Sequence, residues 1–112
     1  MTVTAKTIVA SKIAENSQTT QYTATNVRTI IDKFTATNYS AGAITLSINL
    51  VTLADTAGNQ NLIVKLKSIG AGETYTFPEI VGHVLNNGDF ISTIASAATS
   101  LTIRSSGREV TI

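Results

Sequence analysis

The clearest pattern in this chain is AITLSINL at residues 43–50. Every second residue from Ile44 to Leu50 is a large aliphatic residue, and the residues between them are Thr, Ser and Asn. This spacing matches the two-residue period of a β-strand, in which successive side chains point to opposite faces. The stretch therefore predicts a strand with one face on a hydrophobic core.

The composition of the whole chain favours strands over helices. Of its 112 residues, 19 are Thr, 13 are Ile and 8 are Val, so that 40 side chains are branched at Cβ. Such side chains lose rotamer freedom in a helix and pack well on a pleated sheet. A chain of this length fits one hydrophobic core. We therefore expect a single domain over residues 1–112.

Turn residues divide the rest of the chain into further short strands. Segment 27–37 also fits a helical template, because Val27, Ile30, Ile31 and Phe34 are spaced like one face of a helix. Its six β-branched residues, and the turn of hairpin length that follows, favour a strand. The other segments with strand character are residues 6–14, 18–24, 62–69, 73–77, 89–95, 100–104 and 109–112.

The pattern of residues 62–69 and 100–112 predicts two further details. In the first segment Leu62, Val64 and Leu66 should face the core, with Lys65 and Lys67 in water. In the second, the small polar residues 105–107 (Ser-Ser-Gly) should form a tight turn between the last two strands.

Residues 78–85, PEIVGHVL, are the one predicted helix. Pro78 suits a first helical turn, Glu79 complements the N-terminal end of the helix dipole, and the Asn-Asn-Gly at 86–88 would end the helix. About eight short strands and this one helix predict an all-β fold: a single antiparallel β-sandwich of jelly-roll or immunoglobulin-like type.

Residues 1–24 allow two structures, and the sequence leaves both open. They form either an extended arm, which adds a strand to a neighbour's sheet, or edge strands of this sandwich. Ile8 and Ile13 would be the apolar anchors of an arm. Tyr22 and Tyr39 are aromatic residues that would support glycan binding if both were exposed on one face. These four residues are the candidate assembly contacts.

Residue chemistry predicts no catalytic residue, metal site or cofactor. The chain has no Cys, and its one His, His83, has Glu79 at helical spacing but no further ligand nearby. The seven acidic residues are scattered singly along the chain. With eight basic residues against seven acidic ones, the charge balance gives no attraction to nucleic acid, and no apolar segment is long enough to cross a membrane. We expect a protein that is not an enzyme.

Several stretches taken together resemble small virion proteins of tailed bacteriophages. They are VRTIIDKFTATN at 27–38, the strand at 44–50, GETY at 72–75, PEIVGHVL at 78–85, GDFIS at 88–92 and LTIRSSGRE at 101–109. The resemblance covers about residues 25–112. The preceding residues fall outside it, and family members would differ there in what they bind.

The resemblance implies a non-enzymatic structural protein of the phage particle. Within that class, the β-sandwich decoration or cement proteins, which stabilise the shell by binding between capsid subunits, match best in size. A tail or head–tail joining component, or a virion adhesin module that binds a host surface glycan, is the alternative. The implied partners are the major capsid protein or other virion proteins, with self-association into a dimer or trimer. The implied location is the virion, after synthesis in the host cytoplasm.

Overall fold

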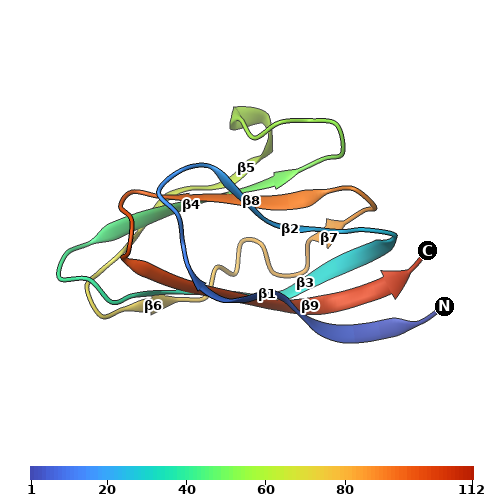
Figure 1. Ribbon diagram of the computed structural model, residues 1–112, viewed down its shortest axis with the longest axis horizontal. Coiled ribbons are helices and arrows are strands. Elements are labelled where there is room, and N and C mark those ends of the chain that lie inside the picture. The colour runs from blue at the N-terminus through green and yellow to red at the C-terminus, as the bar shows by residue number, and fades with distance from the viewer.

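Two antiparallel sheets packed face to face contain almost all of the regular structure (Figure 1). The computed structural model describes residues 1–112. Sheet A has the strand order β1 (Val3–Ile13), β9 (Leu101–Thr111), β3 (Val27–Asn38) and β6 (Thr74–Tyr75), and the short β7 (Val84–Leu85) also pairs with β3. Sheet B has the order β2 (Thr19–Thr23), β8 (Phe90–Ala95), β4 (Ile44–Val51) and β5 (Leu62–Ile69). The predicted all-β sandwich is confirmed.

The strand order distinguishes between the two predicted types of sandwich. The first strand pairs with the last, β2 pairs with β8, β3 pairs with β6 and β7, and β4 pairs with β5. This is a long hairpin folded over on itself, which is the topology of a jelly roll. In an immunoglobulin domain the first two strands are neighbours in one sheet, whereas here β1 and β2 lie in different sheets.

The hydrophobic core lies between the sheets, and the 43–50 stretch contributes to it as predicted. Leu46 and Ile48 of β4 are fully buried. Phe34 of β3 meets Phe77 edge to face, with 5.5 Å between the ring centroids. Two polar residues of β4, Ser47 and Asn49, are also buried. The loop that follows the strand covers Asn49, whose Nδ2 donates to the carbonyl oxygen of Gly58 at 3.1 Å.

Strand β3 confirms the strand interpretation of residues 27–37 and explains their helical spacing. Between Ile31 and Lys33, β3 contains one residue more than β9 does opposite, so Asp32 forms a bulge. A bulge resets which residues of a strand face the core. Ile31 and Phe34 therefore both point inward although they are three positions apart.

The expected inward face of β5 is confirmed at Val64 and wrong at Leu66. Leu62 lies opposite Asn49 and outside the core, and Lys67, expected in water, is partly buried. The register with β4 contains an extra residue between Val64 and Lys67, and this bulge turns Leu66 outward, where it is 59% exposed. Leu66 has a φ of 50°, and its N–H donates to Ser47 Oγ at 2.9 Å. Beyond the bulge the alternation is reversed, so Ile69 is the next buried residue.

The predicted helix at residues 78–85 is wrong. The chain instead makes turns, in which the Ile80 N–H donates to Phe77 O, and then enters β7. Ile80 is fully buried, and the N–H of Gly82, at a φ of 89°, donates to Ile31 O of β3 at 2.7 Å. A helix of eight residues has little stability of its own in water. Burial of Ile80 and pairing with β3 therefore determine the conformation.

The predicted turn at residues 105–107 is also wrong, because residues 101–111 form one continuous strand. Gly107 lies in the middle of sheet A, where a Cβ atom would be 2.4 Å from the Ile30 carbonyl oxygen. Ser105 is buried, and its Oγ donates to Lys33 O at 2.7 Å. The small residues thus allow close packing between two central strands, and the chain does not turn there.

Residues 3–23 belong to the sandwich of this chain as two edge strands. β1 pairs only with β9, and β2 pairs only with β8. The first five residues of β1, Val3 to Thr7, are all exposed, whereas Ile8 and Val9 are buried in the core. Both chain ends lie at the same end of the sandwich (Figure 1).

Candidate interaction surface

The four candidate assembly contacts do not come together in the structure. Ile8 is 7% exposed and belongs to the core of this chain, so its side chain is not available to a partner. Ile13 is 47% exposed and lies opposite Thr102 of β9. Of the four candidate contacts, only Ile13 and Tyr39 are exposed.

Tyr22 and Tyr39 lie at opposite ends of β3 and do not form one face. The Tyr22 hydroxyl contacts Thr29, near the start of β3, whereas Tyr39 follows directly after the last residue of that strand. Ten residues of strand separate Thr29 from Tyr39, which corresponds to roughly 33 Å. The condition that would have favoured glycan binding by these two rings is not met.

Tyr22 instead links the two sheets through a chain of polar contacts. Its hydroxyl donates to Glu109 Oε2 at 2.5 Å and accepts a hydrogen bond from the fully buried Thr29 hydroxyl at 2.7 Å. Lys6 Nζ lies 3.2 Å from the other carboxylate oxygen of Glu109. Residues from β1, β2, β3 and β9 thus meet in one polar cluster.

The protonation states in this cluster are those of a structural contact. Partial burial and the neighbouring Glu109 carboxylate raise the pKa of Tyr22 to about 12. The hydrogen bond from Tyr22 in turn lowers the pKa of Glu109. Proton transfer near neutral pH requires the opposite, an acid and a base whose pKa values approach the working pH.

His83 and Glu79 also lie apart from any catalytic arrangement. His83 is exposed, and the Glu79 carboxylate accepts a hydrogen bond from the Tyr75 hydroxyl at 2.7 Å. No three His, Cys, Asp or Glu side chains lie close enough together to hold a metal ion.

The structure contains no helix with the length and apolar character of a membrane span.

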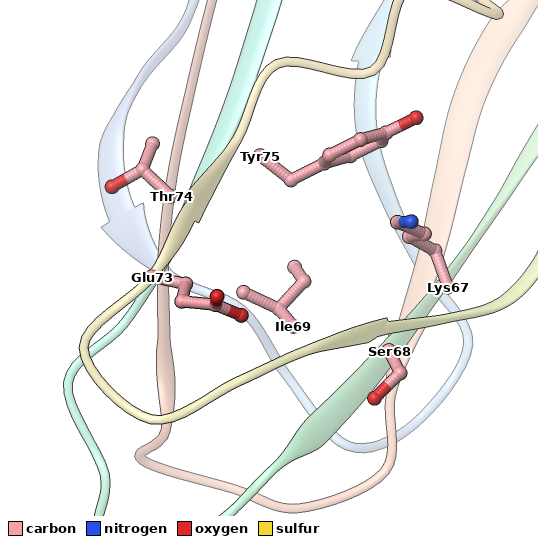
Figure 2. Close-up of a pocket in the computed structure, with 6 residues that line it drawn as sticks. All are labelled: Lys67, Ser68, Ile69, Glu73, Thr74 and Tyr75. Carbon is pink, nitrogen blue, oxygen red and sulfur yellow. The ribbon is translucent and has the colours of Figure 1, made fainter.

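One pocket, of about 390 Å³, lies between the edge strands β5 and β6. Figure 2 shows Tyr75 and Lys67 facing each other on one side, with Glu73 across from them and Ile69 between. Lys67 Nζ lies 4.3 Å from the centroid of the Tyr75 ring, within the range of a cation–π contact. The bulge of β5 directs Lys67 toward this ring.

Glu73 and Tyr75 of the pocket are hydrogen-bonded within the protein. Glu73 Oε1 accepts the N–H of Gly70 at 2.7 Å and thereby closes the turn between β5 and β6. The hydrogen bond from Tyr75 lowers the pKa of Glu79, and the same contact raises the pKa of Tyr75. These groups stabilise the edge of the sandwich, and the pocket contains no free pair of acid and base.

The outer face of sheet A carries many exposed residues, and we call it the A face. Its residues alternate along β9 and β3 with those that point into the core. The strand registers arrange them in rows across β1, β9 and β3: Val3, Val110 and Arg28; Ala5, Arg108 and Ile30; Thr7, Ser106 and Lys33; Arg104 and Thr35; Ile13, Thr102 and Thr37.

The A face concentrates the basic residues of the chain. Arg28, Lys33, Arg104 and Arg108 are all exposed, and Asp32 is the only acidic side chain beside them. Four basic residues and one acidic residue give this face a net charge of +3, whereas the remaining four basic and six acidic residues give the rest of the chain −2. The overall charge of +1 therefore hides two regions of opposite sign.

Sequence reasoning missed this face because its charged residues are far apart along the chain. Arg28 and Lys33 come from β3, whereas Arg104 and Arg108 come from β9. Two positions four residues apart in one strand share a face, so the spacing of Arg104 and Arg108 indicates a shared face if both lie in one strand. The turn that the sequence predicts at residues 105–107 separates them and conceals this signal.

Comparisons with known proteins add no relative: no protein-family model, no curated protein and no solved structure gives a match to this chain.

Proposed function

We propose that this chain is a structural protein of a tailed bacteriophage particle, and that it acts as a capsid decoration or cement protein. It would bind between capsid subunits and stabilise the shell without enzymatic activity. The proposal starts from the resemblance of residues 25–112 to small virion proteins. Its partners would be the major capsid protein or other virion proteins, and its location the virion.

The observation that carries this proposal is the A face. It is an open sheet surface on which exposed arginines stand beside aliphatic side chains such as Val3, Val84 and Ile30. Arginine is enriched in protein interfaces whereas lysine is depleted there, and the centre of an interface is more apolar than the rest of the surface. The polar clusters at Tyr22 and Tyr75, by contrast, are satisfied within the chain.

The experiment is to mix the purified protein with capsids that were prepared without it, and to measure cosedimentation as a function of protein concentration. We expect saturable binding at a fixed ratio to the capsid subunit, and a raised temperature of capsid disruption. Density for the chain at symmetric positions in a reconstruction would locate the contact. Absence of cosedimentation, or binding that never saturates, would contradict the proposal. Binding to isolated tails alone would favour the tail or joining role.

A further inference from the structure

The basic residues of the A face form a zigzag across its two central strands. In the register of β3 with β9, Lys33 lies opposite Ser106, which is two residues from both Arg104 and Arg108. Arg28 lies opposite Val110, two residues beyond Arg108. Diagonal neighbours of this kind are roughly 7–8 Å apart between Cα atoms. Four cations therefore follow one another at similar spacing along the face.

One of these cations already binds a carboxylate on this face. Arg108 Nη2 lies 2.9 Å from Asp32 Oδ1, and Arg108 Nε lies 3.0 Å from Asp32 Oδ2, so the guanidinium holds both oxygens. This two-point contact is the geometry in which arginine recognises carboxylates. Both side chains remain more than 40% exposed. A partner's carboxylates could make the same kind of contact with the other basic residues of the A face.

The remaining cations lack an acidic partner within the chain. Arg104 only donates to the hydroxyls of Ser11 and Thr7, at 3.0 Å and 3.3 Å. Arg28 and Lys33 make no ion pair and no side-chain hydrogen bond. Of these three, Lys33 and Arg104 are diagonal neighbours across β3 and β9 and repel each other, and a partner that carries negative charge would relieve this repulsion.

The A face fits an acidic protein surface better than the other polyanions or a second copy. Proteins that bind single-stranded nucleic acid stack bases on aromatic rings, and the paired rows of the A face contain no aromatic residue, the exposed Tyr39 lying beyond their last pair. A second copy placed face to face would bring a charge of +3 against another +3. The aliphatic residues Val3 and Val110, with Ile30 in the neighbouring row, further suit a protein partner, because the centre of a protein interface is more apolar than its rim.

We propose that the A face is the docking surface of this protein, and that it binds an acidic protein surface whose carboxylates contact Arg28, Lys33 and Arg104. That this acidic surface belongs to a capsid subunit rests on the proposed function. The chemistry of the face does not depend on it. Two independent measurements therefore test the docking surface and the identity of the partner.

The first measurement uses poly-L-glutamate as a defined acidic polypeptide. Amide chemical shifts of the full chain should change at β3 and β9 on titration, and the changes should disappear at high salt, where exposed charges are screened. The variant R28Q/K33Q/R104Q should bind about tenfold more weakly, the sum of three exposed charge contacts. Lys65→Gln removes an exposed cation from β5 of sheet B and should leave binding unchanged. Asp32→Asn frees Arg108 and should strengthen binding.

Three results would overturn the proposal in this measurement. They are equal binding by the wild type and the triple variant, shift changes centred on β5, and tighter binding of an oligothymidylate of matched charge. The unfolding midpoint of each variant verifies that the fold is retained. The second measurement repeats the capsid cosedimentation with the triple variant and with Lys65→Gln. If the wild type fails to bind capsids, the proposed function fails while the titration still decides about the face. If the triple variant binds capsids as well as the wild type, docking through the A face is wrong and the proposed function stands.

Discussion

The outer faces of the two sheets are both rich in hydroxyl side chains, but they differ in what covers them. On sheet B the loop after β4 rises over the sheet (Figure 1), and Asn49 is held by Gly58 O and by Asn61 Oδ1, with Asn61 itself buried. Gln18 reaches the same cluster through Ser92 Oγ at 2.8 Å. On sheet A the outward residues of β9 are exposed or partly exposed.

This difference separates two uses of a polar sheet face. The polar groups of sheet B satisfy one another inside the protein, where each lost partner leaves a buried group without a hydrogen bond. Those of the A face are in contact with water, and their replacement changes the stability of the fold little. A surface that tolerates substitution in this way is free to acquire a binding role.

The largest expected effect belongs to β4, which is buried on both faces. Leu46→Ala should lower the free energy of unfolding by about 2–5 kcal/mol, because the methyl groups it removes leave a cavity in the core. Urea unfolding followed by circular dichroism measures this loss. A loss below about 1 kcal/mol would show that the space between the sheets is not closely packed at this position.

The outer residue of the same strand provides the direct comparison with the A face. Asn49→Ala should cost about 1–3 kcal/mol of unfolding free energy, since it removes the hydrogen bonds that the buried Asn49 donates to Gly58 O and Asn61 Oδ1. Thr102→Ala, at an outward position of β9, should cost less than about 1 kcal/mol. Equal losses in the two variants would remove the distinction between the two faces.

The contact that joins the sheets at Tyr22 should appear in the pH dependence of stability. Folding raises the pKa of Tyr22 to about 12, above the ordinary value of about 10. The contact is therefore fully present below pH 10, and stability should fall as the pH rises through 10 to 12, where the unfolded chain loses the proton first. Tyr22→Phe cannot lose this proton. It should cost about 1 kcal/mol near neutral pH and show a smaller alkaline loss than the wild type in unfolding measurements at each pH.

The smallest effect is expected for the basic residues of the A face. Lys33→Gln should change the free energy of unfolding by less than about 0.5 kcal/mol, because the side chain is exposed and makes no contact that folding requires. The midpoint of urea unfolding verifies this. A loss of more than about 1 kcal/mol would mean that Lys33 stabilises the fold. The outward residues of the A face would then contribute to stability as those of sheet B do.

Local periodicity predicted most of the strands because a strand with one buried face has the same two-residue pattern wherever it lies. The stretch at 43–50 and the segments at 62–69 and 89–95 became β4, β5 and β8 for this reason. The errors occurred where a contact distant in sequence interrupts that period. The bulge at Leu66 is matched by Ser47, and Gly107 is required by the backbone of β3. Neither partner can be recognised from the neighbouring residues.

The sequence by itself determined the all-β class, the single antiparallel sandwich and the inward residues of β4, since these follow from side-chain branching and local alternation. Only the tertiary structure decided the register between strands, and with it the A face. Its cations come from β3 and β9, and Lys33 and Ser106 become neighbours only through pairing across more than half the chain. The one-residue bulge at Asp32 places Asp32 and Lys33 outside together. Register depends on the sum of many backbone and core contacts between distant segments, and a single local segment does not carry that information.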